Sequence, residues 1–222
     1  MGHAHGHGDD HAGGAGPSGP AFFDERAATW DDDPAKVERA GVVADAIAAA
    51  VPLGPATRLL EYGAGTGLVS QALQDRVGPV TLADTSEGMR AVMQAKLDAG
   101  SLAGARIWSL DLAGDDAPDE QFDLIVTVMA LHHIADLARV LASFAALLAP
   151  DGHLCIVDLD HEEGTFHGEG FAGHHGFHRP ELAERLAAAG FGPVAFEDCH
   201  EIERDGVPYT LFLAVAARRP AG

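Results

Sequence analysis

Residues 59–67 read LLEYGAGTG, and this stretch decides the fold. Its leucines end an apolar run typical of a buried strand, and its glycines allow a tight turn into the helix expected from residue 68. A strand, a glycine-rich turn and a helix in this order are typical of open α/β sheets that bind a nucleotide at the N-terminus of the helix. The stretch therefore predicts a nucleotide site at the carboxyl end of the first strand.

Strand-like and helix-like segments alternate after this turn, which predicts a parallel sheet with helices on both faces. Two later apolar runs are separated by Asp205-Gly206, a strong hairpin signal, so the last strand is expected to be antiparallel. The predicted fold class is α/β, a Rossmann-like, doubly wound, seven-stranded sheet with an antiparallel last strand and helices on both faces. The expected strands are residues 58–62, 80–83, 105–110, 122–128, 152–159, 194–203 and 207–217, and the expected helices between them are residues 68–77, 88–99, 135–148 and 179–189.

The chain divides into three expected parts. Residues 1–20 are rich in glycine, histidine and aspartate, which predicts a disordered tail, with metal binding by its alternating histidines as the alternative. Residues 21–56 are expected to form a helical lid, in which the sequence DDDP supplies the cap and first turn of a helix over residues 35–51. Residues 57–222 are expected to form the nucleotide-binding domain. The lid aromatics either close over the ligand or pack the first helix onto the domain; they are Phe22, Phe23 and Trp30.

The composition restricts the class of partner. The chain has 222 residues, with 34 acidic side chains against 14 lysines and arginines, for a formal net charge of −20. Such a surface repels phosphate backbones and anionic lipids, so neither nucleic acid nor a membrane is expected as a partner. No apolar run approaches the roughly 18–20 residues that span a bilayer, and the start lacks the pattern of a secretion signal. We expect a cytoplasmic protein, monomeric or homodimeric, that acts on a small molecule.

Three classes of ligand use a glycine turn of this kind. Dinucleotide sites favour G-x-G-x-x-G, whereas residues 63–67 give G-x-G-x-G, and the Gly-Lys-Ser/Thr of a P-loop is absent. Glu61, two residues before the first glycine, suits an ammonium-bearing ligand better than a pyrophosphate. Asp84 ends the next strand, about where a carboxylate that binds ribose hydroxyls is expected. The turn alone does not separate a dinucleotide from an ammonium-bearing nucleoside.

Taken with the rest of the chain, these motifs resemble the class I S-adenosylmethionine-dependent methyltransferases, particularly the small methyltransferase-domain group that acts on low-molecular-weight acceptors. The resemblance runs from about Phe22 to the C-terminus. The family motifs match residues 59–67, 80–84 (followed by TSEGM), 111–112, 122–126 and 148–154, the last with Asp151 in place of the commoner glycine.

The resemblance implies S-adenosylmethionine as the cofactor and a role for residues at each strand end. Glu61 would orient the glycine turn or reach the amino group of the cofactor through water. Asp84 would accept hydrogen bonds from both ribose hydroxyls, and Asp111 from the exocyclic amine of the adenine. The implied lining is Gly63, Ala64, Gly65 and Gly67 at the methionine portion, Thr85, Met89 and Leu112 at the adenine, and Val128, Met129 and Ala130 at the floor near the sulfonium.

The acceptor chemistry is expected in the histidine-rich segment after the fifth strand, residues 158–178. One interpretation is a metal site, but the spacing fits no standard zinc motif, so no metal is predicted. A second is a general base with a pKa near neutrality, and a third is a solvated polar loop. Similar segments ending in His-Gly-Phe occur in the family, which makes His175 and His178 the first candidates for a catalytic base. His132 and His133 resemble the Leu-His-His segment of the family; His133 is a third catalytic candidate, and packing by both is the alternative.

The expected function is methyl transfer from S-adenosylmethionine to a small-molecule acceptor by in-line displacement. Residues 127–130 (TVMA) are apolar where many amino-group methyltransferases of nucleic acids and proteins carry Asn/Asp-Pro-Pro-Tyr/Phe/Trp. This favours a small O-, S-, N- or C-acceptor. Two alternatives stay open: a nucleotide-dependent oxidoreductase on the same scaffold, and a non-catalytic domain that binds S-adenosylmethionine.

Overall fold

A seven-stranded sheet forms the centre of the computed structural model, which describes residues 19–219. The strands are β1 (Leu59–Tyr62), β2 (Val80–Ala83), β3 (Arg106–Trp108), β4 (Phe122–Val128), β5 (Leu148–Leu159), β6 (Phe191–Arg204) and β7 (Val207–Arg218). Their order is β3-β2-β1-β4-β5-β7-β6; β1 to β5 run parallel, and β7 lies antiparallel between β5 and β6. The predicted fold class is confirmed. The predicted tail, except for its last two residues, lies outside the described residues.

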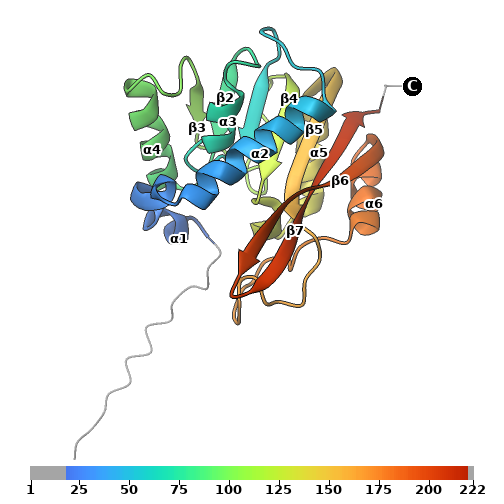
Figure 1. Cartoon of the computed structure of the whole chain (residues 1–222). Coiled ribbons are helices and arrows are strands. Elements are labelled where there is room, and N and C mark those ends of the chain that lie inside the picture. Colours follow the sequence, from blue (N-terminus) through green and yellow to red (C-terminus); the bar gives the residue numbers. More distant parts are fainter. Residues whose placement is uncertain (1–18, 220–222) are drawn as a thin grey trace, which may run out of the picture.

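Helices cover both faces of the sheet (Figure 1). They are α1 (Pro20–Asp24), the 3₁₀ helix η1 (Ala27–Asp32), α2 (Pro34–Ala50), α3 (Leu68–Leu73), α4 (Glu87–Asp98), the 3₁₀ helix η2 (Leu131–His133), α5 (Leu137–Leu147) and α6 (Arg179–Ala188). Helices α2, α3 and α4 share one apolar core with Leu59, while α5 and α6 share another with Leu60. Adjacent leucines of β1 thus point to opposite faces, as expected of a strand buried on both sides. No described helix is long and apolar enough to cross a membrane.

Most element ends follow the predicted signals, and the exceptions have local causes. Asp33 caps α2 by accepting a hydrogen bond from the Ala35 N–H (3.0 Å), and His178 directly precedes α6, as predicted. Strand β5 begins at Leu148 rather than at the predicted residue 152. Of the extra residues only Leu148 pairs, with Phe122 of β4, and the next pair is Leu124 with His153. The predicted turn, in which Asp151 has a φ of 63°, therefore forms a bulge in β5.

The carboxyl ends of the parallel strands meet at one edge of the sheet. The chain changes direction across the sheet between β1 and β4, the switch point where open α/β sheets bind their ligands. The loops after these two strands touch, because a Cβ on Gly63 would lie only 2.5 Å from the Cβ of Ala130. Helix α1 and the loop between β5 and α6 lie at this same edge (Figure 1). The fold therefore brings the predicted donor residues and the loop that carries the predicted histidines to the same edge of the sheet.

Candidate active site

The glycine turn after β1 is fixed to the end of β2 by Asp84. Gly63 and Gly65 have φ angles of 70° and 57°, a left-handed backbone that strains any residue with a side chain. The Gly65 N–H donates to Asp84 Oδ2 (2.7 Å), and the Ser86 N–H donates to Asp84 Oδ1 (2.8 Å). Burial raises the pKa of Asp84. Each carboxylate oxygen keeps a lone pair for a further donor, so Asp84 remains able to accept from a ligand.

Glu61, on the carboxyl half of β1, is almost completely buried. Its Oε2 accepts a hydrogen bond from the Ser70 N–H (2.9 Å), which ties β1 to the first turn of α3. Burial raises the pKa of Glu61 to about 7, and the hydrogen bond from Ser70 opposes that rise. This contact is the loop-orienting kind that the family resemblance implies for Glu61.

The residues predicted beside an adenine lie at the ends of β2 and β3 and differ in accessibility. Asp111 and Thr85 are exposed, whereas Met89 is buried with 1% of its surface accessible. The buried Leu112 N–H donates to the hydroxyl of Tyr62 (3.0 Å), so this backbone donor is already used. Asp111 and Thr85 are therefore accessible to a ligand, whereas Met89 and Leu112 are buried.

The segment after β4 carries backbone strain. Met129 has a φ of 53°, which is uncommon for a residue with a side chain, and its N–H donates to the Val157 carbonyl (2.8 Å). Such conformations cost about 1–3 kcal/mol and gather at functional sites. Val128 and Met129 are half-buried against the core of the α2 face. The strained turn directs the chain from β4 into η2, where His132 and His133 lie.

The N-terminal segment formed by α1 and η1 is bound to the same edge by two aspartates. Asp24 Oδ1 accepts a hydrogen bond from Ser86 Oγ (2.5 Å). Asp31 Oδ1 accepts from Thr66 Oγ1 (2.5 Å), and Asp31 Oδ2 lies 2.6 Å from Lys96 Nζ. The segment is therefore attached to the turns after both β1 and β2. Sequence reasoning missed these contacts, because the DDDP run signals only a helix start and no local pattern relates it to Thr66.

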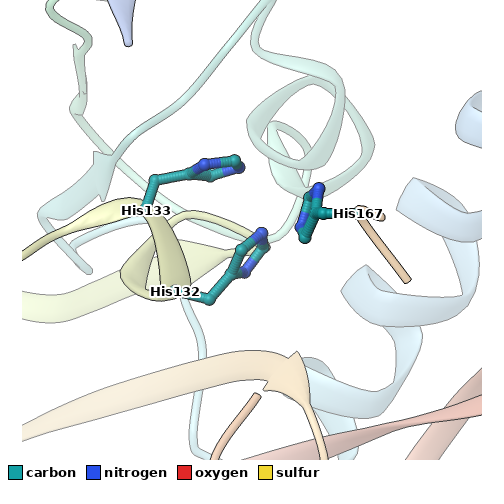
Figure 2. Close-up of side chains that lie close together, drawn as sticks. All are labelled: His132, His133 and His167. Atoms are coloured by element: carbon teal, nitrogen blue, oxygen red, sulfur yellow. The ribbon is translucent and has the colours of Figure 1, made fainter. Parts of the chain in front are cut away.

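Three histidines from two distant segments meet beside this edge. His132 and His133 come from η2, His167 comes from the loop before α6, and Figure 2 shows their rings gathered together. One ring nitrogen from each lies within 4.8 Å of the others. His132 Nδ1 is also 2.6 Å from Asp158 Oδ1, and both residues are buried. Phe23 packs edge-on against His133 with 5.2 Å between ring centroids. The structure thus joins the predicted His133 to two histidines and to the N-terminal segment.

Burial keeps part of this histidine cluster uncharged. It lowers the pKa of His133 to about 3, with smaller contributions from His132 and His167. Burial likewise lowers the pKa of His167 to about 4. A histidine with so low a pKa is a weak base at neutral pH. His133 is therefore better suited to present a lone pair than to take up a proton.

The other two predicted catalytic histidines have different neighbours. His175 Nδ1 lies 3.3 Å from Glu162 Oε1, and the His175 ring lies 5.9 Å from Phe171, which stacks on His167. His178 instead packs against His161 with tilted rings, 3.9 Å between centroids. Both line a hollow of about 320 Å³ beside α6. The structure thus connects His175 to the histidine cluster through Phe171 and places His178 against a different partner.

The sheet order and the carboxylates at the switch point define a nucleotide-binding domain of the Rossmann-like methyltransferase type. The methyltransferase-domain family model matches residues 35–195, well over half of the chain. The chain therefore belongs to this family, the class I S-adenosylmethionine-dependent methyltransferases, as the sequence motifs predict.

Individual relatives agree with this membership. An uncharacterized methyltransferase of Schizosaccharomyces pombe is 33% identical over 144 residues, which cover 61% of this chain and 48% of that protein. The structure of the DhpI–SAH complex superposes with a TM-score of 0.69 at 24% identity, covering 90% of this chain and 95% of the other. A methyltransferase in complex with the Haloferax volcanii Trm112 activator superposes with a TM-score of 0.70 at 19% identity, covering 89% and 97%. The chain spans about half or less of the length of the curated relatives it matches.

The residues at the switch point fit S-adenosylmethionine, the cofactor of the family. No described atom lies within 4 Å of the position that a Gly65 Cβ would take, so a ligand has room to approach the turn. Asp84 retains acceptor capacity for hydroxyl groups. Glu61 places a buried carboxyl group with a pKa of about 7 behind the turn, where a nearby ammonium group favours its charged form.

Proposed function

We propose that this chain transfers the methyl group of S-adenosylmethionine to a small-molecule acceptor. One observation carries the proposal. At the switch point, the glycine turn that Asp84 holds lies against the strained segment that leads to His133. The formal charge of −20 opposes acceptors that carry many phosphates. The apolar residues 127–130 favour an acceptor that is held by shape rather than by a polar clamp on an amino group.

The proposed donor site keeps the roles implied by the family. The glycine turn holds the methionine portion, and Glu61 orients that turn through Ser70. Asp84 accepts from the ribose hydroxyls, and Asp111 accepts from the adenine amine. The remaining proposed contacts are Thr85, Met89 and Leu112 beside the adenine, and Val128 and Met129 nearest the reacting carbon.

When bound, the cofactor supplies a methyl group activated by a positively charged sulfur. The task of the chain is to align the acceptor with that group and to exclude water, and such positioning can lower the barrier by about 7–11 kcal/mol. We assign the exclusion of water to the α1–η1 segment, because Asp31 holds it on the donor turn while Phe23 reaches His133. Helix α2 belongs to the sheet core, so the proposed lid is shorter than residues 21–56.

An acceptor that enters with its proton attached has to lose it. His175 is the first candidate for a general base, because its Nδ1 lies 3.3 Å from the Glu162 carboxylate, which can pair with the ring once it carries a proton. His178 is the second candidate. His133 is the third, since its pKa of about 3 makes it a weak proton acceptor.

Turnover against a panel of small thiols, phenols and amines, measured as S-adenosylhomocysteine formed, tests the proposed function. Replacing His175 with alanine is expected to slow turnover by about 10²–10⁴-fold if His175 is the base, with His178→Ala as the comparison. Calorimetry with S-adenosylhomocysteine and with NADH tests the donor site separately. Binding of NADH without binding of S-adenosylhomocysteine would overturn the proposed donor site, and binding of S-adenosylhomocysteine without turnover of any compound would favour a non-catalytic domain.

A further inference from the structure

The histidine cluster after β4 has the composition and spacing of a metal site. His132, His133 and His167 each bring one ring nitrogen to within 4.8 Å of the other two, and their rings gather around a shared space (Figure 2). A tetrahedral zinc ion with Zn–N bonds of about 2.0–2.1 Å places its nitrogens about 3.4 Å apart. Small inward rotations of the side chains close this difference, and the glycine-rich loop that carries His167 allows such a movement.

Three ring nitrogens of the cluster have no hydrogen-bond partner among residues 19–219. They are Nε2 of His132, Nδ1 of His133 and Nε2 of His167, and all three are buried. A buried polar atom without a partner costs about 1–3 kcal/mol, so three such atoms in one cluster are a large cost to the fold. A metal ion removes this cost at all three nitrogens at once, because each nitrogen donates its lone pair to the ion.

Asp158 gives the cluster the support that metal-binding histidines usually have. Its Oδ1 lies 2.6 Å from His132 Nδ1, and His132 and Asp158 have exposed fractions of 1% and 0%. The same carboxylate accepts a hydrogen bond from the Leu159 N–H (2.8 Å), which holds it in place. A carboxylate on one ring nitrogen keeps the proton there and leaves the other nitrogen as a ligand, as in carboxylate–histidine–zinc arrangements. Nε2 of His132 is thereby left to bind an ion.

We propose that His132, His133 and His167 bind a divalent transition-metal ion of the zinc type, with Asp158 orienting His132. Imidazole is a preferred ligand of such ions, and a chain with a net charge of −20 attracts cations. Three protein ligands leave a fourth position open, which distinguishes catalytic zinc sites from structural ones. The methyl acceptor occupies that position as an anion, an assignment that rests on the proposed function.

The ion favours acceptors that bind it as anions, namely thiols and hydroxyl compounds. Binding to the metal lowers the pKa of such a group, so its proton leaves more readily, to the proposed base or to solvent. A lone pair of the bound sulfur or oxygen then forms the new bond to the methyl carbon. The carbon–sulfur bond of the donor breaks at the same time, and its electron pair stays on the sulfur of S-adenosylhomocysteine. Phe171, stacked on His167 at 3.9 Å, supplies an apolar wall beside the ion.

Zinc binding is tested on the full chain with alanine at His3, His5, His7 and His11, so that these alternating histidines of the tail cannot contribute ligands to the ion. The protein is stripped with a chelator and reloaded with Zn²⁺, and its metal content and affinity are measured. We expect about one zinc ion per chain. His167→Ala is expected to weaken zinc binding at least about 100-fold, and Asp158→Asn about 10–100-fold. His200→Ala, on the outer strand β6, is the matched control and leaves zinc affinity unchanged.

A zinc content near zero, or equal zinc affinities in His167→Ala and His200→Ala, overturns the metal site. Circular dichroism of each variant shows whether it folds. If Asp158→Asn, which alters a buried residue, does not fold, the test depends on His167→Ala alone. Binding of S-adenosylhomocysteine with turnover but without zinc removes this inference and leaves the proposed function. Zinc binding without turnover of any small molecule keeps the metal site and removes the proposed function.

The open position is tested with the Co²⁺-loaded form of the chain that carries the same four alanines, because its visible spectrum then reports only the ligands of the ion in the cluster. Addition of 2-mercaptoethanol is expected to add a thiolate-to-cobalt band and to shift the existing bands. The His167→Ala variant is expected to give neither change. An unaltered spectrum in the parent chain overturns acceptor binding at the ion.

Discussion

The proposed donor side and the proposed acceptor side of this site differ in where their residues lie in the sequence. The proposed donor side consists of the turns after β1, β2 and β3, and its residues, such as Glu61 and Asp84, lie at strand ends. The proposed acceptor side joins His133 to His167, which is 34 positions further along the chain, and to the N-terminal Phe23. Parallel strands bring their carboxyl ends to one edge, so the sheet itself fixes the position of a residue at a strand end. A loop residue has no such constraint.

The two sides touch at Gly63, and a substitution there is expected to have the largest effect. A Cβ at Gly63 would lie 2.5 Å from the Cβ of Ala130, on a φ of 70°. Gly63→Ala should therefore combine left-handed strain of about 1–2 kcal/mol with overpacking of about 1–3 kcal/mol. Urea unfolding measures the loss.

The matched control for this substitution is Gly65→Ala, which has a similar φ of 57° but no described atom within 4 Å of the new Cβ. It should show only the strain of about 1–2 kcal/mol. It should nevertheless weaken binding of S-adenosylhomocysteine, because the new methyl group takes space proposed for the ligand. Equal stability losses in the two variants would mean that the loops after β1 and β4 do not press on each other.

The same contrast explains how much of the molecule was predictable. Strands β2 and β4 match their predicted residues, and the antiparallel hairpin follows from Asp205-Gly206, because these signals are local. The acceptor side was not predictable in this way. No zinc spacing relates His133 to His167, so the sequence indicated no metal, whereas the metal site proposed above depends on a loop that folds back onto η2. The bond between Asp31 and Thr66 was missed for the same reason.

A second test concerns the buried carboxyl group behind the donor turn. The pKa of Glu61 is raised from 4.5 to about 7 in the folded chain. The folded chain therefore holds a proton that the unfolded chain releases, so this stabilising contribution is complete below pH 4.5 and is lost as the pH rises through 7. The shift corresponds to about 3 kcal/mol. Glu61→Gln should be more stable than the parent chain at pH 8, and the difference should shrink towards pH 5.5.

Chemical denaturation at several pH values measures this difference, with the exposed Glu87→Gln as the control. A parallel pH dependence in the parent chain and Glu61→Gln would contradict the raised pKa. Added S-adenosylmethionine should restore the stability of the parent at pH 8 more than that of Glu61→Gln, if the ammonium group lies near this carboxylate.

A third test asks whether the donor side works as a binding site on its own. Asp84→Asn removes the charge that we propose accepts two ribose hydroxyls. Hydrogen bonds to charged groups contribute about 1.5–3 kcal/mol each. The amide oxygen of asparagine still accepts a weaker hydrogen bond, so the affinity for S-adenosylhomocysteine is expected to fall by about 30–100-fold. Calorimetry checks this, with the exposed Asp98→Asn on α4 as the control. An unchanged dissociation constant would remove Asp84 from the site, and unchanged zinc affinity in Asp84→Asn would show that the two sides bind independently.

The smallest expected effect comes from the segment that connects the two sides. Asp31 pairs with Lys96 and accepts from Thr66, and the charged pair is partly buried, with exposed fractions of 29% and 14%. Asp31→Asn should weaken attachment of α1 and η1 by about 1 kcal/mol. Their amide hydrogens should then exchange about fivefold faster, while exchange in α2 stays the same because α2 is packed in the sheet core. Asp45→Asn breaks a pair with Arg76 that is more exposed, and it should leave exchange in α1 and η1 unchanged. Faster exchange across α2 as well would show that the lid extends over residues 21–56, as the sequence predicts. The proposed acceptor side would then open together with the core helix and not by release of a short segment.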